Sequence, residues 1–375
     1  MPEIKLHLGS RVAIRKPEFD RLLANLAQAG YQTIGPRVKD AAVVYGPIGG
    51  LRDLPQGVTS EQTAGYYRLK PSGNERYFDL TAGPQSWKQY LFPARSELFK
   101  LAKENGNWRE ELLNQATPKY AFIGVRACEL SAIEVQDRVF LRDDFSDPIY
   151  RQRREQVFIL AVDCLHPGGT CFCVSMGSGP AAKQGFDLKL TELDEVFLLE
   201  VGTQAGLDAI QDLSVESLAI KWQEDAARCL AEAARSMGRF IPDIKSVPDL
   251  LLNNLDHAEW DEVATRCLSC TNCTQVCPTC FCWDVEDATT LDGKTTQRSR
   301  VWDSCFNPAF SGLAGGNIRP NTKARYRQWL THKMSTWVDQ FGVLGCVGCG
   351  RCITWCPASI DITEEIKAIR VGARE

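Results

Sequence analysis

The sequence is short of the features that mark several other classes of protein. Its 375 residues include only four histidines, and these are too dispersed for a Ser/His/Asp grouping to be argued. No run of about 18 apolar residues occurs, so we expect no membrane-spanning helix. The formal net charge is -4, and this predicts no basic surface for nucleic acid.

Signatures of nucleotide binding are missing as well. No G-x-G-x-x-G follows a predicted strand, and no G-x-x-x-x-G-K-[ST] is present. The glycine-rich stretch at 312–317 does not match a phosphate loop. The first residues, Met1-Pro2-Glu3-Ile4-Lys5, show no basic segment followed by an apolar one, so we expect no secretion signal and a cytoplasmic location.

Cysteine, in contrast, is abundant. The chain has 16 cysteines, and 11 of them follow residue 260. In a secreted protein this number would suggest disulfides, but here the spacing is that of metal ligands. We therefore expect a reducing compartment in which most of the thiols bind iron.

Two cysteine runs have the spacing C-x2-C-x2-C-x3-C-P, at 267–278 and 346–357. In this pattern three thiolates wrap one [4Fe–4S] cluster, and the fourth, before proline, ligates the neighbouring cluster. Zinc sites favour ligands in two pairs, so zinc explains the runs less well. The first predicted cluster has the ligands Cys267, Cys270, Cys273 and Cys356. The second has the ligands Cys346, Cys349, Cys352 and Cys277.

The periodicity of the chain predicts an α+β protein with two domains. Residues 1–240 are expected to form a mixed α/β domain, with a helix after Pro17 and strands at 41–45, 120–125, 157–162 and 195–201. Residues 214–237 are expected to be helical. From 241 to 375 we predict an all-helical dicluster ferredoxin-like domain, because 321–340 has helical spacing and Asp361 to Glu364 can cap a last helix.

A third metal site is predicted in the N-terminal half. Two of the predicted strands lead directly into cysteine-bearing loops, so four thiolates can converge. The candidate ligands are Cys128, Cys164, Cys171 and Cys173. An iron–sulfur cluster, zinc and the absence of any metal all stay open here, since C-x-C spacing does not identify the occupant. His166 lies in the same loop, where it is either a further ligand or a surface group.

Three cysteines near the first run, Cys280, Cys282 and Cys305, are one short of a closed site. Asp284 or Asp303 would have to complete it, and the simpler interpretation is that these thiols are small buried groups beside the clusters. Cys229, alone on a predicted helix, is interpreted as structural. The segment between the runs is basic, at Lys323, Arg325, Arg327, His332 and Lys333. These residues either form a solvated helix face, or they offset the negative charge of the clusters or bind an acidic partner.

Several of these segments together resemble a known family. They are Arg300-Val-Trp-Asp-Ser-Cys305, Gly315-Gly-Asn-Ile-Arg319-Pro320, His332-Lys333, Phe341 to Cys352, Gly124-Val-Arg-Ala-Cys128 and Gly169-Thr-Cys171-Phe-Cys173. The chain resembles the β (iron–sulfur) subunit of soluble NAD(P)-linked [NiFe] hydrogenases, or sulfhydrogenases. The A subunit of anaerobic sulfite reductase shares the pattern.

The resemblance implies a non-catalytic subunit that carries single electrons. A partner with flavin would exchange hydride with NAD(P)H and split the electron pair, and [NiFe] hydrogenase small and large subunits would receive the electrons. The alternative is that the electrons pass to a sirohaem subunit in an anaerobic sulfite reductase. Two interpretations from other classes are a stand-alone reductase of a small molecule and an oxygen-sensing regulator, for which no DNA-binding element is visible.

Overall fold

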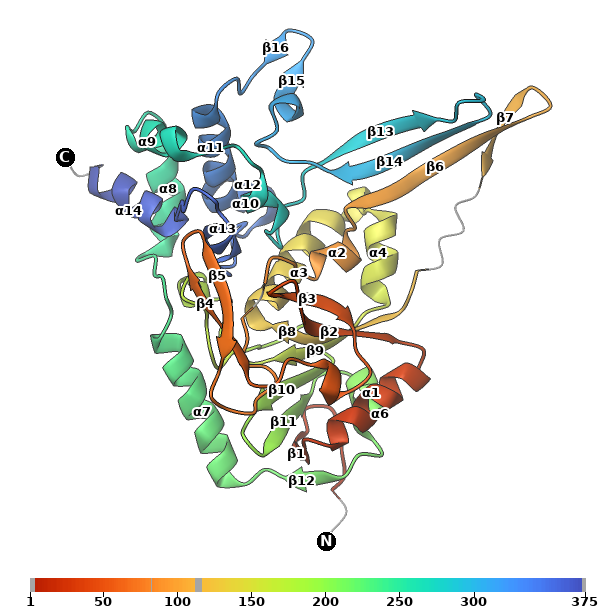
Figure 1. The fold of residues 1–375 in the computed structure, drawn as a ribbon, viewed down its shortest axis with the longest axis vertical. Coiled ribbons are helices and arrows are strands. Elements are labelled where there is room, and N and C mark those ends of the chain that lie inside the picture. The colour runs from red at the N-terminus through yellow and green to blue at the C-terminus, as the bar shows by residue number, and fades with distance from the viewer. Residues whose placement is uncertain (1–3, 82, 112–116, 373–375) are drawn as a thin grey trace.

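An eight-stranded mixed sheet forms the centre of the N-terminal half (Figure 1). The computed structural model describes residues 4–81, 83–111 and 117–372. The strand order is β12-β1-β11-β10-β9-β8-β2-β3. The strands are β1 (Arg11–Arg15), β2 (Gln32–Lys39), β3 (Ala42–Pro47), β8 (Tyr120–Arg126), β9 (Phe158–Val162), β10 (Leu188–Glu192), β11 (Val196–Val201) and β12 (Val215–Ser217). The strands predicted at 41–45, 120–125, 157–162 and 195–201 are therefore present.

Helices cover both faces of this sheet. The helices of the N-terminal half are α1 (Glu18–Gln28), α2 (Lys88–Leu91), α3 (Ala127–Phe140), α4 (Pro148–Glu155), α5 (Cys173–Met176), α6 (Gln204–Ile210) and α7 (Ile220–Arg235). Side chains alternate along β8, so Ile123 packs in the core with α1 and α6, while Phe122 packs in the core with α2, α3 and α4. The helices predicted after Pro17 and within 214–237 correspond to α1 and α7.

The parallel arrangement of β8 and β9 places two cysteine loops at one edge of the sheet. Both strands run in the same direction, so their carboxyl ends meet there. β8 leads into α3, which carries Cys128 in its first turn, and β9 leads into the loop with Cys164. Residues 36 positions apart in the chain thus lie near one another.

A second, four-stranded antiparallel sheet projects from the body of the molecule as a long ribbon (Figure 1). Its order is β13-β14-β6-β7. The strands are β6 (Arg95–Glu104), β7 (Asn107–Glu111), β13 (Trp283–Thr289) and β14 (Thr295–Trp302). Two smaller hairpins are formed by β4 (Val58–Thr63) with β5 (Tyr66–Pro71) and by β15 (Gly312–Leu313) with β16 (Gly316–Asn317).

The C-terminal third is built around short helices with a shared apolar core. They are α8 (Val247–Leu252), α9 (Glu259–Arg266), α10 (Asn272–Gln275), α11 (Thr322–Thr331), α12 (Trp337–Phe341), α13 (Arg351–Thr354) and α14 (Ile362–Gly372). A π-helical turn, His332–Thr336, joins α11 to α12, so the helix predicted at 321–340 is present with a local widening. Trp260, Trp329 and Ile366 are among its buried core residues. Within the described residues, no helix is long and apolar enough to cross a bilayer.

The prediction of an all-helical C-terminal domain was wrong. Residues 283–302 form the hairpin β13–β14, which turns at Asp292-Gly293, where Gly293 has a φ of 64°. Threonines and valines on both sides of an Asp-Gly turn favour a hairpin over a helix. On its other side β14 pairs with β6, a strand from the N-terminal half of the chain. The predicted boundary near residue 240 falls between α7 and α8, and the division into two domains there stays a prediction.

Candidate iron–sulfur centres

The two cysteine runs have the same local backbone. In the first run Ser269 and Thr271 adopt left-handed conformations, with φ of 49° and 69°. At the matching positions of the second run, Gly348 and Gly350 have φ of 65° and 73°. Such conformations are unfavourable for residues with a Cβ and persist where the surroundings impose them. The two runs therefore share the same loop conformation at matching positions.

The first cavity contains the ligand set predicted for one cluster. Cys267 and Cys270 lie between α9 and α10, Cys273 lies on α10, and Cys356 follows α13. All four line a single cavity, which also contacts Cys352 from the other predicted set. Its remaining wall includes the aromatic residues Phe306, Tyr326 and Trp329. Two segments that are far apart in the chain are thereby brought together as the exchange of fourth ligands requires.

The second group lies beside the first. Burial and the neighbouring thiols of Cys346, Cys349 and Cys277 raise the pKa of Cys352 well above its ordinary value. The backbone N–H of Gly348 donates to Cys346 Sγ at 3.4 Å. Burial raises the pKa of Cys346 to about 12, so at neutral pH a bound metal has to displace its proton. Cys346, Cys349 and Cys277 are thus close enough to Cys352 for their charges to raise its pKa, and their assignment to one cluster stays a prediction.

A buried lysine accompanies this second group. Lys333 lies on the π-helical turn and is 2% exposed. Its Nζ donates to Cys277 Sγ at 3.3 Å, to Thr279 Oγ1 at 3.0 Å and to the carbonyl oxygen of Gly345 at 3.0 Å. Burial disfavours the charged form, but the Cys277, Cys280 and Cys346 thiolates outweigh this and raise the lysine pKa well above its ordinary value. Lys333 thus keeps a positive charge against the sulfur.

The four cysteines of the predicted third site line one cavity. Cys128, Cys164, Cys171 and Cys173 share it with Cys349 of the second run. Burial raises the pKa of Cys171 to about 12. The loop that contains Phe172 and the loop that contains Gly348 lie in close contact. A Cβ atom added at Gly348 would lie only 2.6 Å from the carbonyl carbon of Phe172. The third site is therefore adjacent to the second.

A buried ion pair supports the contact between these two sites. Arg351 lies within the second run, between Cys349 and Cys352, and is 2% exposed, and Glu129 on α3 is 1% exposed. Arg351 Nη2 donates to Glu129 Oε1 at 2.5 Å. Sequence reasoning missed this pair, because nothing in the local pattern links residues 222 positions apart. His166 lies outside the cavity, and its Nδ1 is 2.6 Å from Asp79 Oδ1.

The cavities have the donors that a cluster requires. Tyr326 in the first cavity has a buried hydroxyl without a hydrogen-bond partner, and Arg351 in the third has a buried Nη1 without one. Sulfides and thiolates of a cluster accept such hydrogen bonds. Within the described residues, no three or more His, Cys, Asp or Glu side chains are arranged for a single metal ion. The residues present fit iron–sulfur clusters.

The basic segment divides into two kinds of residue. Lys323 is partly exposed and pairs with Asp261 at 2.7 Å, as a solvated helix face would. Lys333 instead faces the thiols of the second group. The sequence held a signal for this difference, since Lys333 follows Trp329 and Leu330 by four and three residues and so lies on the apolar stripe.

Comparison with known proteins agrees with these observations. Residues 266–360 match a family model described as a 4Fe-4S dicluster domain, so the chain carries two [4Fe–4S] clusters. The chain is also similar to sulfhydrogenase 2 subunit beta of Pyrococcus furiosus, with 30% identity over 348 residues, which cover 90% of this chain and 95% of that protein. No solved structure matches it significantly. The chain is an iron–sulfur electron-transfer subunit that belongs to the family of sulfhydrogenase β subunits.

Proposed function

We propose that the chain relays single electrons between a flavin subunit that uses NAD(P)H and a [NiFe] hydrogenase module. The observation that carries the proposal is the convergence of both cysteine runs on adjoining cavities, with Cys352 lining the cavity of the first group. Electrons pass most readily between cofactors that lie close together, and here residues of the second run form part of the wall of the first cavity. The ligand sets in this proposal are Cys267, Cys270, Cys273 and Cys356 for one cluster, and Cys346, Cys349, Cys352 and Cys277 for the other.

A third iron–sulfur cluster on Cys128, Cys164, Cys171 and Cys173 extends the relay. Cys349 lines that cavity as well, and Cys171 Sγ lies 3.8 Å from the carbonyl oxygen of Cys349. The three centres therefore form a continuous series from the edge of the large sheet to the α9–α10 loop. Such a series suits a subunit that joins an electron donor on one side to an acceptor on another.

The polar groups around the second centre shift its reduction potential. When bound, the clusters supply reversible one-electron chemistry. The Lys333 ammonium group stabilises added negative charge at Cys277, and the N–H group of Gly348 does the same at Cys346. Both interactions favour the reduced state of the second centre over that of the first.

The partners follow from what the chain itself does not provide. Its sequence has no phosphate-binding glycine loop, and hydride must be split into single electrons by a flavin. The name of the P. furiosus relative includes hydrogenase, which supports a [NiFe] module as the other partner in a cytoplasmic complex. Electron transfer to a sirohaem subunit, as in anaerobic sulfite reductase, is the alternative. The proteins that co-purify with the native chain decide between the two.

Electron acceptance by the isolated chain tests the relay. Anaerobic protein with its clusters should be reduced by dithionite and should not oxidise NAD(P)H, because no flavin is bound. Cys349→Ala should abolish one low-potential EPR signal and remove about four irons per chain. In the complex, this variant should uncouple hydrogen turnover while the flavin-dependent diaphorase activity persists. Direct NAD(P)H oxidation by the isolated chain would overturn the partner assignment.

A further inference from the structure

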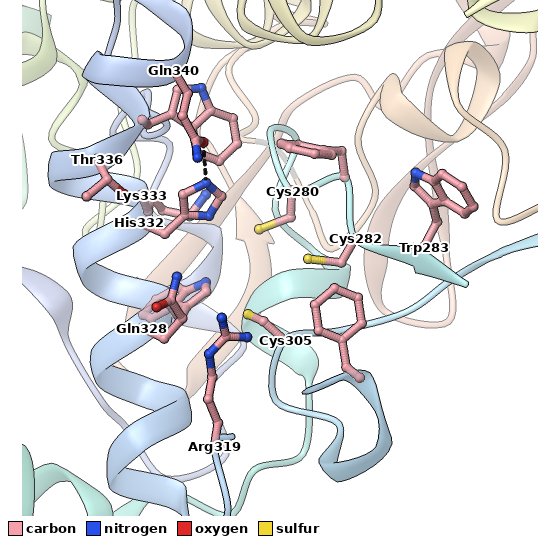
Figure 2. A pocket seen from close by; sticks show the side chains of 14 residues that line it. Cys280, Cys282, Trp283, Cys305, Arg319, Gln328, His332, Lys333, Thr336 and Gln340 are labelled. Carbon is pink, nitrogen blue, oxygen red and sulfur yellow. Dashed lines mark hydrogen bonds between the residues drawn. The ribbon is translucent and has the colours of Figure 1, made fainter. Parts of the chain in front are cut away.

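A cavity of about 370 Å³ lies beside Lys333, the residue that contacts Cys277. Cys280, Cys282 and Cys305 line one wall, and residues of α11, the π-helical turn and α12 line the other. In Figure 2 the three sulfur atoms point into the same space, and Arg319 and His332 face them. None of these three cysteines belongs to a ligand set assigned so far.

The local fold explains why the three thiols converge. Residues 280–282 lead directly into β13, and Cys280, Phe281 and Cys282 all line the cavity. Phe281 is held by edge contacts with the rings of Phe140, Trp337 and Phe341. Cys305 follows β14, the hairpin partner of β13. The hairpin therefore brings the third sulfur to the other two.

The thiols are close enough to share one occupant. Cys305 lowers the pKa of Cys282, while Cys282 raises the pKa of both Cys280 and Cys305. All three sulfur atoms point into the one cavity (Figure 2). The sequence Thr279-Cys-Phe-Cys282 also repeats Thr170-Cys-Phe-Cys173 of the third site. The same short segment thus presents two thiols to a cavity in both halves of the molecule.

Among the described residues that line the cavity, there is no fourth cysteine and no carboxylate. Asp284 and Asp303 do not line the cavity, and Asp303 Oδ1 accepts hydrogen bonds from Ser304 N and Asn307 Nδ2. His332 Nε2 is 2.9 Å from Gln340 Oε1. Arg319 forms no salt bridge within the described part of the chain. The fourth corner of the site is therefore open and faces an unpaired cation.

Donors without partners surround the cavity. Trp329 and Trp337 both line it, and each has a buried indole N–H with no hydrogen-bond acceptor. An unpartnered buried donor costs about 1–3 kcal/mol, so an acceptor at this place is energetically expected. The volume exceeds what one metal ion needs, and inorganic sulfide is such an acceptor.

We propose that Cys280, Cys282 and Cys305 hold a further iron–sulfur cluster, with one iron that has no protein thiolate and is open to a small anion beside Arg319. Lys333 lines this cavity and donates to Cys277 Sγ of the second centre at 3.3 Å, so the two sites are adjacent. The site therefore exchanges electrons with the relay at its second centre. It goes beyond the relay, because it adds a position at which a small anion binds to a redox-active metal.

Iron content tests the site in the full-length chain. Wild type, the double variant Cys282→Ser/Cys305→Ser and the control Cys229→Ser are prepared anaerobically. The double variant should contain about four irons fewer than wild type, and the control should lose none. The EPR signals of the first two centres should persist in all three proteins, which shows that the double variant folds. Equal iron in wild type and double variant, or zinc in the wild-type site, would overturn the proposal.

A second measurement on the wild-type chain does not depend on a variant that folds poorly. Mild ferricyanide takes one electron from a [4Fe–4S] cluster, and the iron without a cysteine leaves as a ferrous ion. A [3Fe–4S] EPR signal should appear in wild type and in Cys229→Ser, and cyanide added beforehand should shift the signal of the open cluster. Arg319→Gln should weaken this effect of cyanide. The absence of a [3Fe–4S] signal, or its persistence in Cys282→Ser/Cys305→Ser, would refute the open iron position.

Discussion

Replacement of Lys333 by methionine removes a buried charge that contacts a ligand of the second centre. The ammonium nitrogen is 3.3 Å from Cys277 Sγ, and methionine keeps most of the volume of the side chain. Since the positive charge stabilises an added electron, its loss should lower the reduction potential of the centre that contains Cys277. The other centres should be affected less.

The magnitude follows from Coulomb's law. At 3.3 Å and an effective dielectric constant of about 20, two unit charges interact by about 5 kcal/mol. For a one-electron couple this corresponds to roughly 200 mV, because 59 mV is a factor of ten. An added electron is shared over the whole cluster rather than held on one sulfur, so we expect about half of this value, a fall of ~100 mV.

A redox titration followed by EPR measures the change. Lys323→Met is the matched control, because Lys323 is on the same helical segment but pairs with Asp261 at the surface at 2.7 Å. Surface pairs contribute about 0–1 kcal/mol, so the control should leave all potentials nearly unchanged. A shift below ~30 mV in Lys333→Met, or an equal shift of every centre, would refute the assignment of Lys333 to Cys277.

Two further predictions concern stability. Glu129→Gln leaves the buried Arg351 charge without its partner and should reduce the free energy of unfolding by about 3–5 kcal/mol in a denaturant titration. Glu134→Gln, a partly exposed residue on the same helix, is the control, and equal effects would contradict the reasoning. Burial and Glu259 raise the pKa of Glu365 to about 8 from 4.5. The stability that this protonated carboxyl contributes is fully present below pH 4.5 and is lost as the pH rises through about 8. The fall in thermal midpoint between about pH 6 and pH 9 should therefore be smaller in Glu365→Gln than in wild type.

Local spacing along the chain was enough to predict much of this protein. The two cysteine runs, the helix after Pro17 and the strands before Cys128 and Cys164 depend on residues within a few positions of one another. Such patterns express the geometry of a single turn, strand or metal-binding loop, and they need no knowledge of distant contacts. For this reason the two-cluster content and the family could be inferred before any coordinates.

Contacts between distant segments were decided by the tertiary structure alone. The pairing of β6 with β14, the ion pair of Arg351 with Glu129 and the meeting of Cys305 with Cys280 join residues that no local pattern relates. A hairpin of threonines and charges is also stabilised by its partner strand as much as by its own residues, which is why a helical domain was predicted wrongly there. Burial of Lys333 likewise depends on the sulfur around it, because an isolated helix would expose such a charge to water.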